Sequence, residues 1–294
     1  MSDLLSTKTT IMVIPGFHKN ILRILSLQNG LKLNAELSKI KKCQGHKKCI
    51  NSISACTTNT SGQSFDFISG SDDCNVNFYD FRSKLSVGNT VFQYPVTSVE
   101  VGRSDTTKAY IGSLDGRIYV LDVRKNTNSN TMQNDSATTS LSNNVVDIYQ
   151  GHGNIITGLA VSFDGNYLLS NSLDNTLRIW DIRPYFSSAS ALSGNMNNNN
   201  NNGNINRNIK TLTGHRHGND KNLLRCGWSG DDRLVSCGSA DHIVHIWDTQ
   251  TGEELYALPG HKGTINEVVF HPSSNESIVA SCSSDRTIIL GELV

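Results

Sequence analysis

The sequence predicts an all-β protein, a β-propeller whose blades are four-stranded antiparallel sheets. Three observations lead to this prediction. A twelve-residue segment with serine at its third position and aspartate at its fifth occurs five times without a gap. A Gly-His dipeptide precedes four of these five segments. The spacing from Gly214 to Gly260 is 46 residues, close to the ~40–45 residues that one four-stranded propeller blade occupies.

Each twelve-residue segment has the pattern of a β-hairpin. In the third copy the apolar run Tyr167–Leu169 leads into Asp174-Asn175, and apolar and aromatic residues then resume up to Trp180. Asp and Asn favour turns because their side chains bond to their own backbone, and the flanking alternation is typical of strands. The five copies cover residues 69–80, 111–122, 170–181, 237–248 and 281–292, with the turn aspartates Asp73, Asp115, Asp174, Asp241 and Asp285.

Two more strands complete each unit. One short strand precedes the Gly-His dipeptide, as in 254–258, and another follows it, as in 265–270. We therefore expect five clear four-stranded blades within residues 45–294. Residues 1–44 contain no Ser-x-Asp hairpin, but 10–14, 21–27 and 38–44 have strand character, so we expect a partial blade or closing strand there.

Two polar inserts interrupt the repeat, at about 125–144 and 184–207. The second contains eight asparagines within residues 195–204. Such tracts bury too little apolar surface to fold, so we expect disordered loops between the third and fourth strands of their blades, at the outer rim.

The bulk composition excludes several classes of protein. A net charge of +0 provides no long-range attraction to nucleic acid or to an anionic membrane. No apolar run is long enough to span a bilayer, and the N-terminus does not have the pattern of a secretory signal. Seven cysteines without a CxxC pair indicate reduced thiols, as in the cytosol or nucleus. A zinc site at Cys226, His215 and His217 is disfavoured because structural zinc ligands come in closely spaced pairs.

Gly-His followed by Trp-Asp is the signature of the WD40-repeat family, and the chain resembles that family from about residue 38 onward. The resemblance implies a buried hydrogen-bonded set in each blade, which joins the Gly-His histidine, a strand hydroxyl, the turn aspartate and the tryptophan. The matching positions are His46, Ser69 and Asp73 in the first unit; His152, Ser170, Asp174 and Trp180 in the third; His215, Asp241 and Trp247 in the fourth, where Cys237 replaces the hydroxyl; and His261, Ser281 and Asp285 in the last.

A His–Asp–Ser set also suggests catalysis, but an active site is not repeated around a ring. The motifs GxxxxGK[ST], HExxH and GxSxG are all missing from the sequence. We therefore expect a structural network in a protein that is not an enzyme and needs no cofactor.

Candidate partner-binding positions lie at the expected mouth of the central channel. Asn51, Thr157 and Asn266 come five residues after a Gly-His histidine, and Thr97 and Arg225 are the corresponding positions in the other two units. Their role would be to dock a peptide or a protein surface, and the alternative is a solvated mouth. Five lysines between Lys39 and Lys48 lack interleaved aromatic residues, so we expect RNA contact to be indirect or weak.

A narrower resemblance rests on four stretches: LLSNSLDNTLRIWDIRPY (168–185), KNLLRCGWS (221–229), LPGHKGTINEVVFHP (258–272) and SSDRTIILGEL (283–293). They are similar to the family of the 40-kilodalton WD-repeat subunit of the U5 small nuclear ribonucleoprotein. That resemblance implies a nuclear, non-catalytic scaffold of the spliceosome that contacts U5 proteins. The family has seven blades, so we expect that this chain lacks blade-sized sequence present in its relatives.

The alternative function is a substrate receptor of a cullin-type ubiquitin ligase, or another WD40 adaptor. Trp180-Asp181-Ile182-Arg183 resembles the WDxR box of such receptors, and residues 79–82 and 121–124 have a related pattern. The competing interpretation is that each arginine pairs locally with the aspartate before it.

Overall fold

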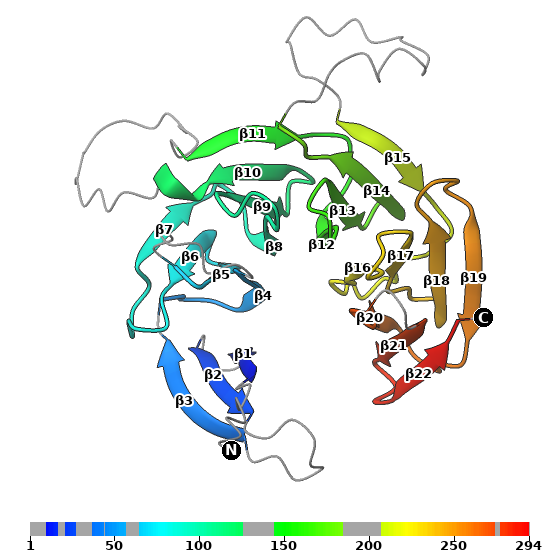
Figure 1. Cartoon of the computed structure of the whole chain (residues 1–294), viewed down its shortest axis with the longest axis horizontal. Coiled ribbons are helices and arrows are strands. Elements are labelled where there is room, and N and C mark those ends of the chain that lie inside the picture. Colours follow the sequence, from blue (N-terminus) through cyan, green and yellow to red (C-terminus); the bar gives the residue numbers. More distant parts are fainter. Residues whose placement is uncertain are drawn as a thin grey trace, which may run out of the picture.

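The computed structural model describes residues 10–16, 21–27, 37–43, 45–56, 65–125, 144–184, 207–273 and 277–293. They form six antiparallel sheets that follow one another around a common centre (Figure 1). A three-residue 3₁₀ turn, Val123–Lys125, is the one helical element of the described residues. No helix in this part of the chain is long and apolar enough to cross a bilayer. The predicted all-β class is confirmed.

The sheets follow the chain order. The N-terminal sheet contains β1 (Thr10–Gly16), β2 (Ile21–Leu27) and β3 (Leu37–Cys43). Blade I contains β4 (Ile50–Ala55), β5 (Phe67–Ser71), β6 (Asn75–Tyr79) and β7 (Gly88–Val91). Blade II contains β8 (Val96–Val101), β9 (Lys108–Ser113), β10 (Ile118–Asp122) and β11 (Val145–Tyr149). Blade III contains β12 (Ile156–Val161), β13 (Tyr167–Ser172), β14 (Thr176–Asp181) and β15 (Asn208–Leu212). Blade IV contains β16 (Cys226–Trp228), β17 (Leu234–Cys237), β18 (Ile243–Asp248) and β19 (Glu254–Pro259), and blade V contains β20 (Ile265–Phe270), β21 (Ile278–Ser283) and β22 (Ile288–Glu292).

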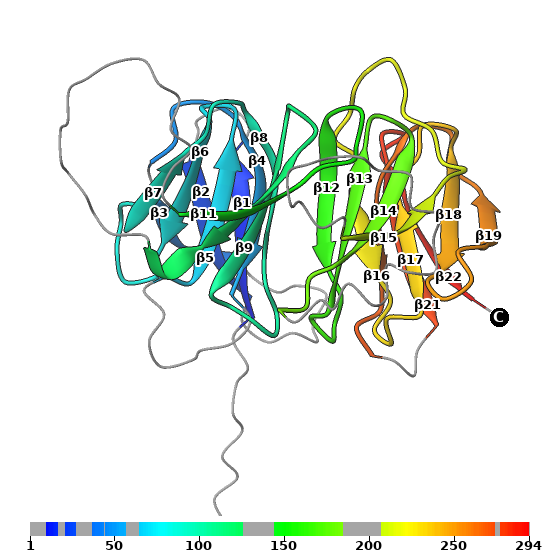
Figure 2. The same cartoon turned by 90° about the horizontal axis from the view of Figure 1, so that it is seen from above.

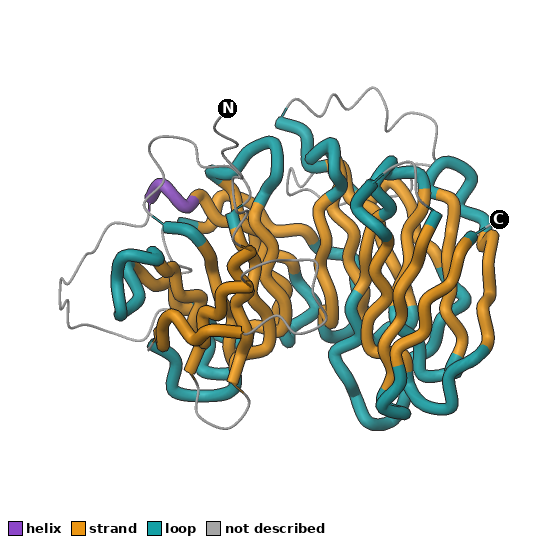
Figure 3. The backbone as a smooth tube through the Cα atoms, turned by 60° about the horizontal axis from the view of Figure 1, so that its bottom comes forward, coloured by secondary structure: helices purple, strands orange, loops and turns teal. Residues whose placement is uncertain are grey.

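In every blade the first strand lies nearest the centre and the chain then moves outward (Figure 1). The strands run between two loop-bearing ends of the molecule (Figures 2 and 3). Because the strands are antiparallel, the Gly-His segments and the aspartate turns lie at the same end. We call this end the Gly-His face.

One expectation about strand number needs correction. Blades I to IV have four strands, but blade V has three in the described part of the chain. The strands expected at 10–14, 21–27 and 38–44 are β1, β2 and β3. The cores of the two inserts, 126–143 and 185–206, lie outside the described residues. The strands that flank them are the third and fourth of blades II and III.

The recurrent aspartate stabilises the hairpin turn by a local contact. The residue after it has a positive φ in all five blades, 66° at Cys74 and 60° at Asn175 among them. That left-handed conformation is costly for a residue other than glycine. The aspartate offsets the cost because its carboxylate accepts a hydrogen bond from the amide two residues on, at 2.9 Å between Asp174 Oδ1 and the nitrogen of Thr176.

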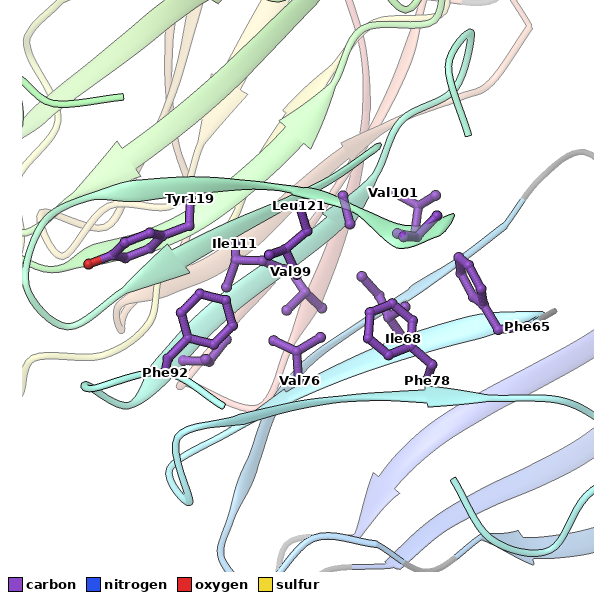
Figure 4. Close-up of a cluster of buried hydrophobic side chains, with 13 residues drawn as sticks. Phe65, Ile68, Val76, Phe78, Phe92, Val99, Val101, Ile111, Tyr119 and Leu121 are labelled. Carbon is purple, nitrogen blue, oxygen red and sulfur yellow. The ribbon is translucent and has the colours of Figure 1, made fainter. Parts of the chain in front are cut away.

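The hydrophobic core lies between neighbouring blades. Ile68, Val76 and Phe78 of blade I pack against Val99, Ile111 and Leu121 of blade II (Figure 4). Strands such as β10 are buried on both sides, which explains why their sequences are apolar almost throughout. Blades II, III and IV are therefore each held by the sheet on either side.

Truncation of Phe78 tests this packing. Phe78 is 1% exposed and meets the edge of Phe65 with ring centroids 5.2 Å apart. We expect Phe78→Ala to lower the free energy of unfolding by about 3–5 kcal/mol, because it removes buried area and leaves a cavity. Urea unfolding followed by circular dichroism measures the loss. Leu85→Ala, at a leucine that is 62% exposed, is the control and should change stability little. Equal losses in both variants would contradict the packing argument.

Candidate functional site

Blade III contains a continuous hydrogen-bonded chain of four side chains. Trp180 Nε1 donates to Ser170 Oγ at 2.8 Å, and Ser170 Oγ lies 2.7 Å from His152 Nε2. The other ring nitrogen, Nδ1, lies 2.9 Å from Asp174 Oδ2. Asp174 also accepts the backbone N–H of Gly153. Each buried polar group thus finds a partner, as burial requires.

The electrostatics of this chain favour a neutral ring beside a charged carboxylate. Burial lowers the pKa of His152, and the neighbouring Asp174 only partly opposes that effect. Burial alone would raise the pKa of Asp174, but hydrogen bonds from His152 and Thr176 outweigh it and lower that pKa. The set ties the Gly-His segment to the hairpin turn, and no substrate-sized space adjoins it among the described cavities.

Blades I and V contain shorter versions of the same chain. His46 lies 2.6 Å from Ser69 Oγ and 3.0 Å from Asp73 Oδ2. In place of tryptophan, blade I has Tyr79, which stacks on Phe67 with centroids 5.0 Å apart. In blade V the corresponding contacts join His261 to Ser281 at 2.8 Å and to Asp285 at 3.1 Å.

Blade IV departs from the expectation that His215 joins Asp241. His215 Nε2 instead lies 2.9 Å from Asn171 Oδ1 in blade III. Asp241 pairs with His245 at 2.9 Å, and the other ring nitrogen of His245 lies 2.7 Å from Glu254. The physical reason is Cys237, which leaves no hydroxyl between the Gly-His histidine and the tryptophan.

Trp247 of blade IV also has a different partner. Its ring N–H donates to the Thr213 carbonyl at 3.2 Å, and its ring stacks on His245 with centroids 5.7 Å apart. Blade II has no Gly-His dipeptide. There the Tyr119 hydroxyl, rather than a histidine, donates a hydrogen bond to the turn aspartate Asp115 at 2.7 Å. Asn171, His245 and Tyr119 were not singled out from the sequence. The signal for Tyr119 and His245 was their shared place four residues after the turn aspartate.

The inner ends of the blades meet at Arg225, one of the five predicted mouth residues. Its guanidinium donates to the backbone carbonyls of Thr157 at 2.9 Å and Thr97 at 3.3 Å, and also to that of Asn51. A single side chain from blade IV thereby binds the innermost strands of blades I, II and III.

Three of the other mouth residues also form hydrogen bonds within the protein, whereas the buried Thr157 hydroxyl has no hydrogen-bond partner among the described residues. Asn51 Nδ2 donates to Asp72 and to the Val96 carbonyl, and the Thr97 hydroxyl donates to carbonyls of blades II and III. Thr97 and Thr157 are buried. Asn266 contacts Ser284 and stays partly exposed. The five positions lie at one end of the channel. Four of them, Asn51, Thr97, Thr157 and Arg225, form contacts between blades or are buried there.

A polar cavity of about 290 Å³ lies beside Arg225. Its lining includes Asn51, Glu100, Arg225 and Glu267. Burial raises the pKa of Glu100 to about 7, against hydrogen bonding from Ser54 and the charge of Arg103. Within the described ranges no group of three or more His, Cys, Asp or Glu residues is arranged to hold a metal ion.

Three arginines of the WDxR-like segments lie beside the preceding aspartates. Arg82 pairs with Asp80, Arg124 with Asp122, and Arg183 with Asp181. The Arg183 side chain is 48% exposed, so its outer surface stays accessible while its charge is matched. The local-pairing interpretation therefore accounts for all three segments.

Comparison with known proteins gives the following matches. The family described as "WD domain, G-beta repeat" matches residues 37–80, 143–181, 206–248 and 252–290. The chain is 37% identical to the Pre-mRNA-splicing factor cwf17 of Schizosaccharomyces pombe over 87% of this chain and 63% of that protein. It is 36% identical to the human U5 small nuclear ribonucleoprotein 40 kDa protein over 87% of this chain and 60% of that protein. The protein of that name from Dictyostelium discoideum is 43% identical over 47% of this chain and 46% of its own length.

The chain thus spans about 60% of the length of the two relatives that align with most of it. Residues 81–142 fall outside the matched repeats. They contain most of blade II, the blade in which Tyr119 replaces the histidine contact.

Removal of the Ser170 hydroxyl tests the polar chain. Ser170→Ala leaves both the Trp180 N–H and His152 Nε2 without their partner in a buried site. We expect the free energy of unfolding to fall by about 2–4 kcal/mol, since each unpaired buried group costs about 1–3 kcal/mol. Chemical denaturation measures the change. Ser284→Ala, at an exposed serine, is the matched control, and a Ser170→Ala variant as stable as this control would refute the network's structural role.

Two histidines that precede β16, the buried His215 and the half-buried His217, predict a pH dependence of stability. Burial lowers the pKa of His215 to about 3 and that of His217 to about 4, from 6.5. The unfolded chain therefore binds more protons than the folded chain between about pH 6.5 and pH 4. Stability should be complete above pH 6.5 and should fall as the pH falls through this window.

Denaturation midpoints measured across that pH range check the sign. His217→Gln removes one titrating group. The free energy of unfolding of this variant should therefore depend less steeply on pH than that of the unchanged protein, by up to about 1.4 kcal/mol per pH unit. A variant that loses stability with acid as steeply as the unchanged protein would show that His217 is not responsible.

Proposed function

The chain belongs to the WD40-repeat family, and on that premise we propose that it is a non-catalytic scaffold of pre-mRNA splicing within a U5-type ribonucleoprotein. The observation that carries the proposal is the similarity, at 36–37% identity across 87% of the chain, to proteins named as a pre-mRNA-splicing factor and as a U5 40 kDa protein. The partners would be other proteins of that particle, and the location would be the nucleus.

The chemistry of the site supports a scaffold. The His–Ser–Asp sets tie the Gly-His segments to the hairpin turns in blades I, III and V. Arg225 is hydrogen-bonded to backbone carbonyls of blades I, II and III. These groups are used to hold the propeller together, so partners would dock on its loops and rims, where the exposed side chains lie.

RNA contact would be indirect or weak. The net charge of the chain is +0, so it lacks the overall positive charge that concentrates proteins on phosphate backbones. A role as a protein-docking platform needs no such charge, because shape and local contacts determine specificity.

The receptor function of a ubiquitin ligase is the second candidate, and Arg183 is the observation behind it. Its guanidinium is half exposed although it pairs with Asp181. A ligase adaptor would need that exposed surface, whereas the splicing proposal assigns Arg183 a local role only.

Affinity purification tests the two functions. The tagged chain, expressed in its own organism, should recover U5 RNA and the large U5 proteins from nuclear extract. We expect Arg183→Glu to recover them as well as the unchanged chain and as well as Lys84→Glu, a charge reversal at an exposed lysine outside the motif. Recovery of a ubiquitin-ligase adaptor without U5 RNA, lost on Arg183→Glu and kept on Lys84→Glu, would replace the splicing function by the receptor function.

A further inference from the structure

One position of the repeat has no side chain in the last blade. In every blade the third strand ends with an acidic residue, and the residue before it is directed at the preceding blade. Blades I to IV have a large side chain there that is 1% exposed: Tyr79, Leu121, Trp180 and Trp247. The corresponding residue of blade V is Gly291, which is exposed. Val279 pairs with Gly291 as Leu168 pairs with Trp180 in blade III.

A cavity marks the place of the missing side chain. It has a volume of about 40 Å³ and lies between blade IV, which contributes Val244 and Leu258, and blade V, which contributes Val279, Ile289 and Gly291. A Cβ atom on Gly291 would meet no other atom within 4 Å. Ile289 and Gly291 are exposed, so the cavity is open to solvent at the rim of the molecule. We call it the Gly291 slot.

Blade III shows which group fills such a slot. The ring of Trp180 stacks on Tyr149 with centroids 5.7 Å apart, and its N–H donates to Ser170 at 2.8 Å. The ring also closes on the Gly-His segment, since a Cβ on Gly151 would lie 3.2 Å from it. The corresponding residues of blade V are Leu258, Ser281 and Gly260, and all three line the Gly291 slot. The slot therefore has the walls of a tryptophan site without the tryptophan.

The polar end of the slot is an acceptor. His261 Nδ1 lies 3.1 Å from Asp285 Oδ2. Hydrogen bonds, that of Thr287 first, hold the pKa of Asp285 well below its usual range, so its carboxylate only accepts and Nδ1 carries the proton. His261 Nε2 then accepts the hydroxyl proton of Ser281, 2.8 Å away. The Ser281 oxygen is left to accept a hydrogen bond, as Ser170 accepts that of Trp180, and Gly291 supplies no donor.

The strand that ends at the slot has an open edge. In the described part of the chain no strand pairs with the outer side of β22. In blades II, III and IV the fourth strand places a residue opposite the position in question, with Val145 opposite Leu121, Asn208 opposite Trp180 and Glu254 opposite Trp247. Directly opposite residues of an antiparallel pair share one face of the sheet. A large ring opposite Gly291 would therefore cover the glycine and enter the slot.

We propose that the Gly291 slot receives a tryptophan side chain from an extended segment of a partner protein, which adds to the outer edge of β22 as a strand. The ring would contact Val244 and Leu258 and donate its N–H to Ser281. Glu292, exposed and next to Gly291, favours a lysine or arginine beside the tryptophan, because opposite charges on paired strands attract. A cavity of about 40 Å³ does not enclose a free indole, whereas the backbone of a segment adds hydrogen bonds to β22. The slot belongs to the chain alone, so this assignment is independent of the splicing function.

Peptide binding to the purified full-length chain tests the proposal. The probe is the acetylated and amidated hexapeptide Thr-Val-Lys-Trp-Val-Thr, and isothermal titration calorimetry measures its Kd. We expect it to bind at least about tenfold more tightly than the same peptide with alanine in place of tryptophan. Benzothienylalanine has the shape of tryptophan without the N–H, and in that place it should weaken binding about 2–10-fold, the contribution of one neutral hydrogen bond. Equal binding of the tryptophan and alanine peptides would overturn the proposal.

Gly291→Trp fills the slot from within the chain. This variant should bind the tryptophan peptide no better than the alanine peptide, and its thermal midpoint should rise by about 2 °C or more because the ring is buried. Leu85→Trp, which adds a tryptophan at an exposed leucine, is the matched control and should change neither quantity. Undiminished binding of the tryptophan peptide to Gly291→Trp would show that the peptide binds elsewhere.

A free tryptophan derivative distinguishes a protein segment from a small ligand. N-acetyl-tryptophanamide has the ring but not the strand, so we expect it to bind at least about tenfold more weakly than the hexapeptide. Equal affinities of the two would assign the slot to a small indole compound and would overturn the docking of a partner strand.

Discussion

The structure depends on one packing requirement, that each sheet buries both of its faces against neighbouring sheets. The third strands carry apolar residues toward both sides, and those of blades I to IV are almost entirely buried. A single blade would expose two apolar faces to water, so its stability comes from its neighbours rather than from its own hydrogen bonds. The exposed third strand of blade V, all of whose residues are accessible, marks the place where this requirement is not met.

The polar chains follow from the same requirement. Close packing of the sheets removes hydroxyl, imidazole and indole N–H groups from water, and each then needs a partner inside the protein. Blade III satisfies them with serine, histidine, aspartate and tryptophan, whereas blade II uses Tyr119 on Asp115 and blade IV uses His245 between Asp241 and Glu254. The residue types differ because pairing is the constraint, and several side chains can fulfil it.

The centre of the arc of sheets shows why the proposed scaffold function is compatible with so many buried polar groups. Arg225 makes its hydrogen bonds to carbonyls of three other innermost strands, so the blades are joined at the channel as well as through their faces. A propeller tied together in this way holds its loops in fixed relative positions. Such rigidity favours docking, because little conformational freedom remains to be lost on binding.

The sequence alone determined the features that depend on near neighbours. The turn aspartate accepts a hydrogen bond from the amide two residues on, and strand alternation is set within one hairpin. The repeat, the blades and the Asp174 turn could therefore be predicted from the sequence. The tertiary structure decided the contacts between distant positions. His215 meets Asn171, 44 residues away, and Arg225 reaches the Asn51 carbonyl across 174 residues. Those partners depend on how the blades are placed around the centre, and no local pattern encodes that placement.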